Sequence, residues 1–174
     1  MDLENIQKCN SEGRKEGISI TNRGEFYKEY DNRLLHHSVQ SLNNKILDIV
    51  IMLATENINV NILCFTEHWL PEVQMNVLNI DDFKLASNFS RKHSKAGGSC
   101  IFIRNNIQTE QVEHLHELGK EKVFEISTIE MPDKNTILTC IYRSPDSDFY
   151  EFLPKLELLI GKLSSKGKRF SVVI

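Results

Sequence analysis

Val60-Asn-Ile-Leu-Cys-Phe-Thr66 forms a nearly continuous apolar run, and Glu67-His68-Trp69 follow it directly. A nearly continuous apolar run of this length is typical of a β-strand that is covered on both faces. Glu67 would then lie at the carboxyl end of the strand, at the edge of the sheet. A carboxylate there suits a hard cation such as Mg²⁺, although taken alone the same residue more often begins a solvated loop.

Strand-like and helix-like segments alternate on both sides of this run. A short strand is predicted over 34–39, and Ser41 is placed to cap a helix with apolar residues at i, i+3, i+4 and i+7 spacing. This alternation predicts an α/β fold. The other predicted elements are strands over 83–89, 98–104, 122–130, 136–143 and 169–174, and helices that begin near Pro71 and after Asp148.

The length and the composition indicate one ordinary globular domain. The chain has 174 residues, of which 40% are hydrophobic, and a net charge of -3. Bulk charge therefore gives no argument for a nucleic-acid partner, and local patches have to supply it. Residues 1–33 form a polar leader that we expect to be disordered, and the domain is predicted over 34–174.

Membrane and disulfide-rich classes are not favoured by the sequence. The longest apolar run, Ile49 to Ala54, is far shorter than a membrane span, and the N-terminus lacks the apolar segment of a secretory signal. Cys9, Cys64, Cys100 and Cys140 show no CxxC spacing, which predicts reduced thiols. We therefore expect an intracellular protein without a membrane partner.

Two segments could contact phosphate groups. Ser90-Arg-Lys-His-Ser-Lys-Ala-Gly-Gly98 is a basic loop in which Arg91, Lys92 and Lys95 could lie along a DNA backbone. Tyr142-Arg-Ser-Pro145 follows an apolar strand, and a phenol and a guanidinium at a strand exit can contact a phosphoryl oxygen. The loop could also be a solvated charge run, and Tyr142 a rim aromatic.

Five segments in register carry a resemblance to a known family. They are His37-Ser-Val-Gln-Ser-Leu-Asn-Asn-Lys45, Ile62-Leu-Cys-Phe-Thr-Glu-His-Trp-Leu70, the Ser-Arg-Lys block with Gly-Gly-Ser-Cys-Ile-Phe-Ile-Arg, the Tyr142-Arg-Ser-Pro145 turn, and the helix behind that turn. Together they resemble the exonuclease-endonuclease-phosphatase superfamily, and more closely the apurinic-type endonuclease domain of non-LTR retrotransposons. The resemblance covers about four-fifths of the chain.

The resemblance implies a fold, a reaction and roles for several residues. The implied fold is the DNase I-like four-layered α/β sandwich, in which helices flank two facing β-sheets and which this chain would form in part. The implied reaction is phosphodiester hydrolysis in DNA with Mg²⁺ or Mn²⁺, and the implied location is nuclear. Glu67 matches the acidic metal ligand and Tyr142 the tyrosine that contacts the scissile phosphate, while Arg143 and the basic loop would bind the DNA backbone.

The chain departs from the family at two places. Ser38 stands where the family has an Asn metal ligand, so we expect weaker metal binding. The Gly-Asp-Phe-Asn and Ser-Asp-His segments that supply later catalytic residues are absent from these 174 residues. We therefore expect a C-terminally incomplete domain that is catalytically inactive as given. A non-catalytic remnant that binds DNA or protein, and a phosphoesterase for another substrate such as an inositol head group, are the alternatives.

Overall fold

Two five-stranded β-sheets face each other in the computed structural model of the chain, which describes residues 17–19, 25–29, 32–55 and 58–174. The strand order is β2-β3-β4-β6-β5 in the first sheet and β1-β10-β9-β8-β7 in the second. The strands are β1 (Gly17–Ser19), β2 (Glu25–Glu29), β3 (Asn32–Ser38), β4 (Ile62–Thr66), β5 (Phe83–Phe89), β6 (Ser99–Arg104), β7 (Glu110–Gln111), β8 (Glu125–Met131), β9 (Thr136–Tyr142) and β10 (Arg169–Val173). The helices are α1 (Leu42–Thr55), α2 (Glu72–Met75), α3 (Glu113–His116), α4 (Phe149–Ser164) and the 3₁₀ turn η1 (Pro132–Lys134).

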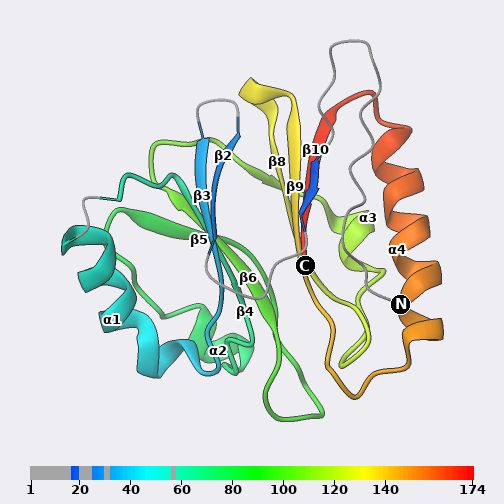
Figure 1. Ribbon diagram of the computed structural model, residues 1–174, viewed down its shortest axis with the longest axis horizontal. Helices are drawn as coiled ribbons and strands as arrows, with labels where there is room; N and C mark the ends of the chain where they lie inside the picture. Colours follow the sequence, from blue (N-terminus) through cyan, green and yellow to red (C-terminus); the bar gives the residue numbers. More distant parts are fainter. Residues whose placement is uncertain (1–16, 20–24, 30–31, 56–57) are drawn as a thin grey trace.

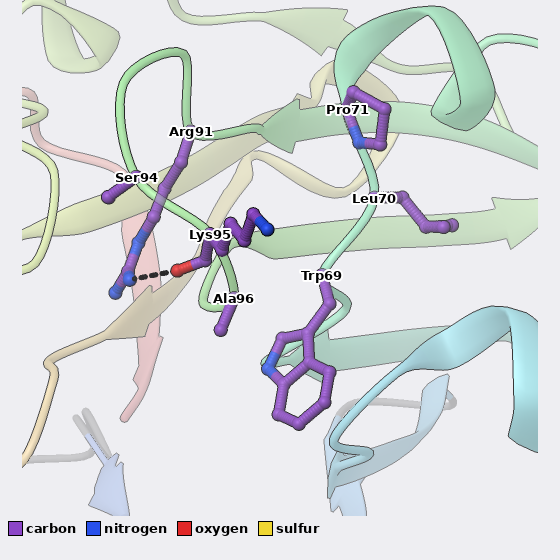
Figure 2. Close-up of a pocket in the computed structure, with 7 residues that line it drawn as sticks. All are labelled: Trp69, Leu70, Pro71, Arg91, Ser94, Lys95 and Ala96. Atoms are coloured by element: carbon purple, nitrogen blue, oxygen red, sulfur yellow. Dashed lines mark hydrogen bonds between the residues drawn. The ribbon is translucent and has the colours of Figure 1, made fainter.

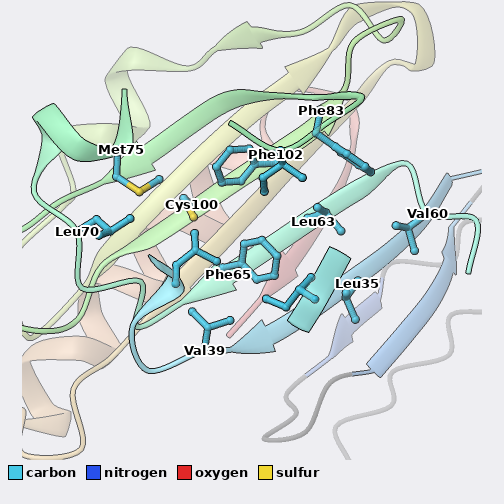
Figure 3. Close-up of a cluster of buried hydrophobic side chains, with 13 residues drawn as sticks. Leu35, Val39, Val60, Leu63, Phe65, Leu70, Met75, Phe83, Cys100 and Phe102 are labelled. Carbon is cyan, nitrogen blue, oxygen red and sulfur yellow. The ribbon is translucent and has the colours of Figure 1, made fainter. Parts of the chain in front are cut away.

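Three apolar clusters separate four layers. One packs α1 on the outer face of the first sheet, a second fills the space between the sheets, and a third packs α3 and α4 on the outer face of the second sheet (Figure 1). Phe65 and Phe102 lie in the first cluster with their ring centroids 6.2 Å apart, and Figure 3 shows them among their aliphatic neighbours. This layering confirms the predicted α/β sandwich with two facing sheets.

The apolar run at residues 60–66 forms the centre of the first sheet. β4 is buried along its whole length, as predicted, and it pairs in parallel with β3 and antiparallel with β6. The parallel register places Ser38 opposite Thr66. Residues that follow β3 and β4 therefore meet at one edge of the sheet.

Part of the expected polar leader lies in the two sheets. β1 pairs in parallel with β10, β2 pairs antiparallel with β3, and β3 begins at Asn32. Strand pairing uses backbone groups, which polar residues carry as well as apolar ones, so a polar composition does not prevent it. Two short strands, β1 and β2, are thus described within the segment that the sequence predicts to be disordered. The rest of the leader lies outside the described residues, and the domain boundary at residue 34 stays a prediction.

A helix starts after Asp148 as predicted, whereas Ser41 does not have the conformation of the predicted N-cap. Asp148 caps α4, because its carboxylate accepts a hydrogen bond of 2.8 Å from the Tyr150 amide. Pro154 lies inside this helix. Ser41 precedes α1 with a φ of +84°, which is not the extended conformation of an ordinary N-cap.

The described cysteines are buried, and the described helices are short. Cys64, Cys100 and Cys140 are each 0% exposed, and burial raises the pKa of the Cys100 thiol. Cys9 lies outside the described residues. Among the described helices, none is long and apolar enough to cross a membrane.

Candidate functional site

Ser38, Glu67 and Tyr142 come together where strands of both sheets end. Glu67 follows β4, and the hydroxyl of Ser38 at the end of the neighbouring β3 donates to Glu67 Oε1 at 2.9 Å. Tyr142 is the last residue of β9 in the second sheet. Burial raises its pKa, and the nearby negative charge of Glu67 raises it further. The phenol is therefore protonated at neutral pH and can donate a hydrogen bond.

The backbone that presents Glu67 is held in a strained conformation. Glu67 has a φ of +57° and Trp69 a φ of +61°, a region that side-chain-bearing residues rarely adopt. The Glu67 amide donates to the Gly98 carbonyl at 2.8 Å, and the Trp69 amide donates to the Gly97 carbonyl at 2.9 Å. Strain of this kind persists only where surrounding contacts fix it, and it is frequent at ligand sites.

His68 links the turn at residues 67–70, the Glu67 turn, to Phe89 at the end of β5, the edge strand of the first sheet. Its side chain is buried, its Nδ1 accepts from the Leu70 amide at 3.0 Å, and its Nε2 lies 2.9 Å from the Phe89 carbonyl. Since Nδ1 accepts, Nε2 must carry the proton that goes to Phe89. Burial lowers the His68 pKa to about 4, with the Phe89 bond raising it and the Arg91 charge lowering it, so the ring is neutral at pH 7.

The glycine pair at 97–98 gives room for the side chains of His68 and Arg91. A Cβ on Gly98 would lie 2.2 Å from His68 Nε2, and a Cβ on Gly97 would lie 2.2 Å from the Arg91 guanidinium carbon. Both glycines also have positive φ, +72° and +92° in chain order. The pair therefore lets the basic loop pass directly over the Glu67 turn.

Arg91 lies inside the protein and not on the surface of the basic loop. Its side chain is 6% exposed, and its Nε donates to Oε1 of the fully buried Glu125 at 2.5 Å. Glu125 also accepts from the backbone amides of Gly98 and Lys122. Arg91 Nη1 donates to the Lys95 carbonyl at 3.0 Å, and Nη2 has no hydrogen-bond partner among the described residues. The ion pair holds the base of the loop, so any contact between Arg91 and DNA has to be made from this buried position.

A second carboxylate fixes the tip of the loop. Glu121 accepts from the Lys92 amide at 2.5 Å, from the His93 amide at 3.1 Å, and from the Ser94 hydroxyl at 3.0 Å. The side chains of Lys92, His93 and Lys95 remain exposed. The loop therefore presents two lysines from a backbone that is already ordered.

The Arg143 side chain makes its contacts within the turn that leads into α4. Its Nη1 donates to both the carbonyl and the hydroxyl of Ser147 at 3.1 Å, and its guanidinium lies 5.9 Å from the ring centroids of Phe149 and Phe152. These contacts fix the start of α4. The structure brings Ser38, Glu67 and Tyr142 together with the basic loop, while Arg143 takes part in a separate cluster.

A hollow of about 330 Å³ opens beside the Glu67 turn, between that turn and the basic loop. Figure 2 shows Trp69 on one side of it and Lys95 and Ala96 on the other. Trp69 is 44% exposed. The hollow is lined by Trp69, Leu70, Pro71, Arg91, Ser94, Lys95 and Ala96.

The ligand chemistry at this edge fits a hard cation in part. Glu67 offers a carboxylate, and the Ser38 hydroxyl keeps lone pairs beyond the bond it donates. Mg²⁺ commonly binds one or two protein carboxylates and completes its octahedron with water and phosphate oxygens. No group of three or more His, Cys, Asp or Glu side chains with ligand geometry exists within the described part of the chain.

Sequence reasoning did not identify His68, Glu121 or Glu125 as parts of this site. Glu125 falls within a predicted strand, and its partner Arg91 is 34 positions away, so no local spacing connects them. The Gly97-Gly98 pair was the one available signal. Adjacent glycines before a strand indicate a close backbone approach, but they do not say which side chain approaches.

The comparisons with known proteins show the fold. No family model matches the sequence, and no curated protein matches it. Solved structures with a similar fold include the endonuclease domain of TRAS1, a telomere-specific non-LTR retrotransposon, at 16% identity and a TM-score of 0.56. The TDP2 structure from D. rerio in complex with single-strand DNA product is 12% identical with a TM-score of 0.52, and the Xenopus laevis APE2 catalytic domain is 12% identical with a TM-score of 0.50.

These neighbours are DNase I-like endonuclease/exonuclease/phosphatase proteins, and the described fold is of that type. In each of the three comparisons the match covers 80% of this chain. It covers 57%, 56% and 57% of the TRAS1, APE2 and TDP2 chains respectively. The chain thus spans little more than half the length of the structures that it matches.

Proposed function

We propose that this chain is part of a metal-dependent DNA phosphodiesterase of the kind found in non-LTR retrotransposons. The observation that carries the proposal is the meeting of Glu67, Ser38 and Tyr142 at the edge of both sheets, beside a loop that exposes Lys92 and Lys95. The DNase I-like fold and the DNA-processing names of its structural neighbours support it.

Each residue has a defined part in the proposal. Glu67 would hold Mg²⁺ or Mn²⁺, and the Ser38 hydroxyl orients its carboxylate through the 2.9 Å hydrogen bond. The bound metal would supply positive charge that stabilises the phosphate in the transition state. The protonated Tyr142 phenol donates to a phosphate oxygen, and Lys92 and Lys95 neutralise neighbouring phosphates.

The 174 residues alone are proposed to bind DNA without cleaving it. A positioned general base contributes about 10²–10⁴-fold to such a reaction, and the Ser-Asp-His segment that supplies it in the family is not among these residues. Binding is therefore the property to measure first.

Replacing Lys92 and Lys95 together with Ala is expected to weaken duplex binding and to lower its salt dependence. Each lost phosphate contact reduces the slope of log affinity against log salt by about 0.9, so the slope should fall by about 1.8. Fluorescence anisotropy of a labelled duplex between low and moderate salt measures it. Arg91 is left in place, because its removal would disturb the buried pair with Glu125.

The matched control removes two lysines elsewhere. Lys84 is exposed near the start of β5, whereas the basic loop follows the opposite end of that strand. Lys166 lies in the turn after α4. The Lys84→Ala, Lys166→Ala double variant carries the same net charge and should keep the parent slope. Equal slopes for all three proteins would contradict a role for the loop.

Glu67→Ala is expected to reduce Mn²⁺ binding by the protein–DNA complex to that of the DNA alone, and Ser38→Ala to weaken the protein-dependent binding by about tenfold, as loss of an orienting hydrogen bond commonly does. The electron paramagnetic resonance signal of free aqueous Mn²⁺ reports the bound fraction. Glu72→Ala, which removes an exposed carboxylate on α2, is the control and should bind normally. Unchanged Mn²⁺ binding by Glu67→Ala would remove this carboxylate from the proposal.

A further inference from the structure

Trp69 presents a large aromatic surface to solvent from a fixed backbone. Its side chain is 44% exposed, and its backbone has a φ of +61° that the hydrogen bond to the Gly97 carbonyl maintains. On one side it adjoins the buried His68, and on the other side Leu70, which is 8% exposed. The backbone that carries the indole is thus fixed, while the indole itself stays partly open to solvent, so stacking of a ligand does not have to order this turn.

The wall opposite Trp69 is equally well ordered, and it is cationic. The Lys95 carbonyl accepts from Arg91 at 3.0 Å, and the Ser94 hydroxyl donates to Glu121 at 3.0 Å. The Lys95 side chain is exposed, and the residues that line the hollow include no carboxylate. Figure 2 shows this wall facing the indole across the hollow. Its charge favours an anionic ligand.

An aromatic face and a lysine together match the two parts of a nucleotide. Single-stranded nucleic acids bind proteins by stacking bases on aromatic side chains while cations contact the backbone phosphates. Trp69 is two residues from Glu67, so their Cα atoms lie at most about 7 Å apart. A base stacked on the indole would therefore belong to a nucleotide next to the phosphate at Glu67.

We propose that the hollow between Trp69 and Lys95 binds one unstacked base of a DNA strand, with the base on the indole and its phosphate near the lysine. This site rests on the proposed DNA function and adds to it a preference for locally unpaired substrate. Burial of the base surface against Trp69 supplies affinity that does not depend on base identity, because every base has a π-face.

The single tryptophan of the chain is the probe for this proposal. A short oligothymidylate is titrated into the 174-residue protein, in parallel with an oligomer of the same length whose nucleotides all lack bases. Both oligomers carry the same phosphates. Tryptophan emission should be quenched by the oligothymidylate and not by the abasic oligomer, and anisotropy of labelled oligomers should show tighter binding of the base-containing strand.

Trp69→Ala is expected to weaken oligothymidylate binding by about 5- to 150-fold, which is the measured range for loss of one base–aromatic stack, and to leave abasic binding unchanged. Trp69→Phe keeps an aromatic face and should retain most of the affinity. Circular dichroism confirms that both variants fold. Should Trp69→Ala fail to fold, the comparison of the two oligomers on the parent protein still tests the site.

The outcomes separate this site from the function on which it rests. Equal binding and equal quenching by the two oligomers, or unchanged oligothymidylate binding by Trp69→Ala, overturns the base site and leaves the DNA function standing. Absence of binding by both oligomers and by duplex DNA overturns the proposed function and the base site together.

Discussion

Glu125→Gln is expected to lower the free energy of unfolding by about 3–5 kcal/mol, the usual cost of removing one partner from a buried ion pair. The Glu125 side chain is fully buried, and the three groups hydrogen-bonded to its carboxylate within the described part of the chain are all donors: the Arg91 Nε, the Gly98 amide and the Lys122 amide. Glutamine has nearly the same shape, but it leaves the Arg91 charge uncompensated and turns an N–H group toward a donor. Urea unfolding followed by circular dichroism measures the loss.

Two further variants test the cause of this loss. Asp82→Asn removes the carboxylate of the exposed pair between Asp82 and Arg104, whose closest atoms are 3.4 Å apart, and should cost less than about 1 kcal/mol. Arg91→Met combined with Glu125→Gln removes the stranded charge as well, so the double variant should be more stable than the sum of the single losses predicts. A Glu125→Gln loss as small as that of Asp82→Asn would contradict the buried-pair account.

The same ion pair connects stability to the proposed function. Glu125 holds the Gly98 amide and Arg91 at the base of the basic loop, and the Gly98 carbonyl receives the Glu67 amide. Loss of Glu125 should therefore release the loop that presents Lys92 and Lys95. The variant is expected to bind duplex DNA more weakly than the parent even under conditions where it remains folded.

The strands and the position of Glu67 could be predicted from the sequence because their causes are local. A nearly continuous apolar run is typical of a strand covered on both faces, so its end marks a sheet edge, and β4 has this burial. Tyr142 could be predicted in the same way, as the residue at the end of β9. Ser38 was assigned to the site by the resemblance. The parallel register of β3 with β4 that brings it there is not determined by periodicity alone.

The contacts that hold the site could not be predicted, because they join residues distant in the chain. Arg91 belongs to a run of cations that looks solvated, and only the fold brings the Glu125 carboxylate to it. His68 lies between Glu67 and Trp69 in an ordinary turn sequence, and its burial depends on Gly98, 30 positions later. A linear pattern identifies the residues that face a ligand more readily than the residues that support them.

The protein is expected to lose about 2 kcal/mol of stability between pH 7 and pH 5 through His68. The pKa of this side chain is 6.5 in an unfolded chain and about 4 in the folded protein, where burial disfavours the charged ring. Between these two values the unfolded state binds the proton and the folded state does not, so acid favours unfolding. The stability that the neutral His68 contributes is fully present above pH 6.5 and is lost as the pH falls toward 4. The total loss at pH 4 is about 3 kcal/mol.

Urea unfolding at pH 7 and at pH 5 tests this expectation with His68→Gln. The variant lacks the titrating ring, so it should be less stable at pH 7 but lose much less stability than the parent between the two pH values. His37→Gln is the matched comparison, because burial and the Lys45 charge lower the pKa of His37 in the same direction although His37 is only half-buried. If His68→Gln kept the full pH dependence of the parent, the proton would be taken up elsewhere. That result would contradict the account in which a neutral His68 holds the Glu67 turn by donating to Phe89 and accepting from Leu70.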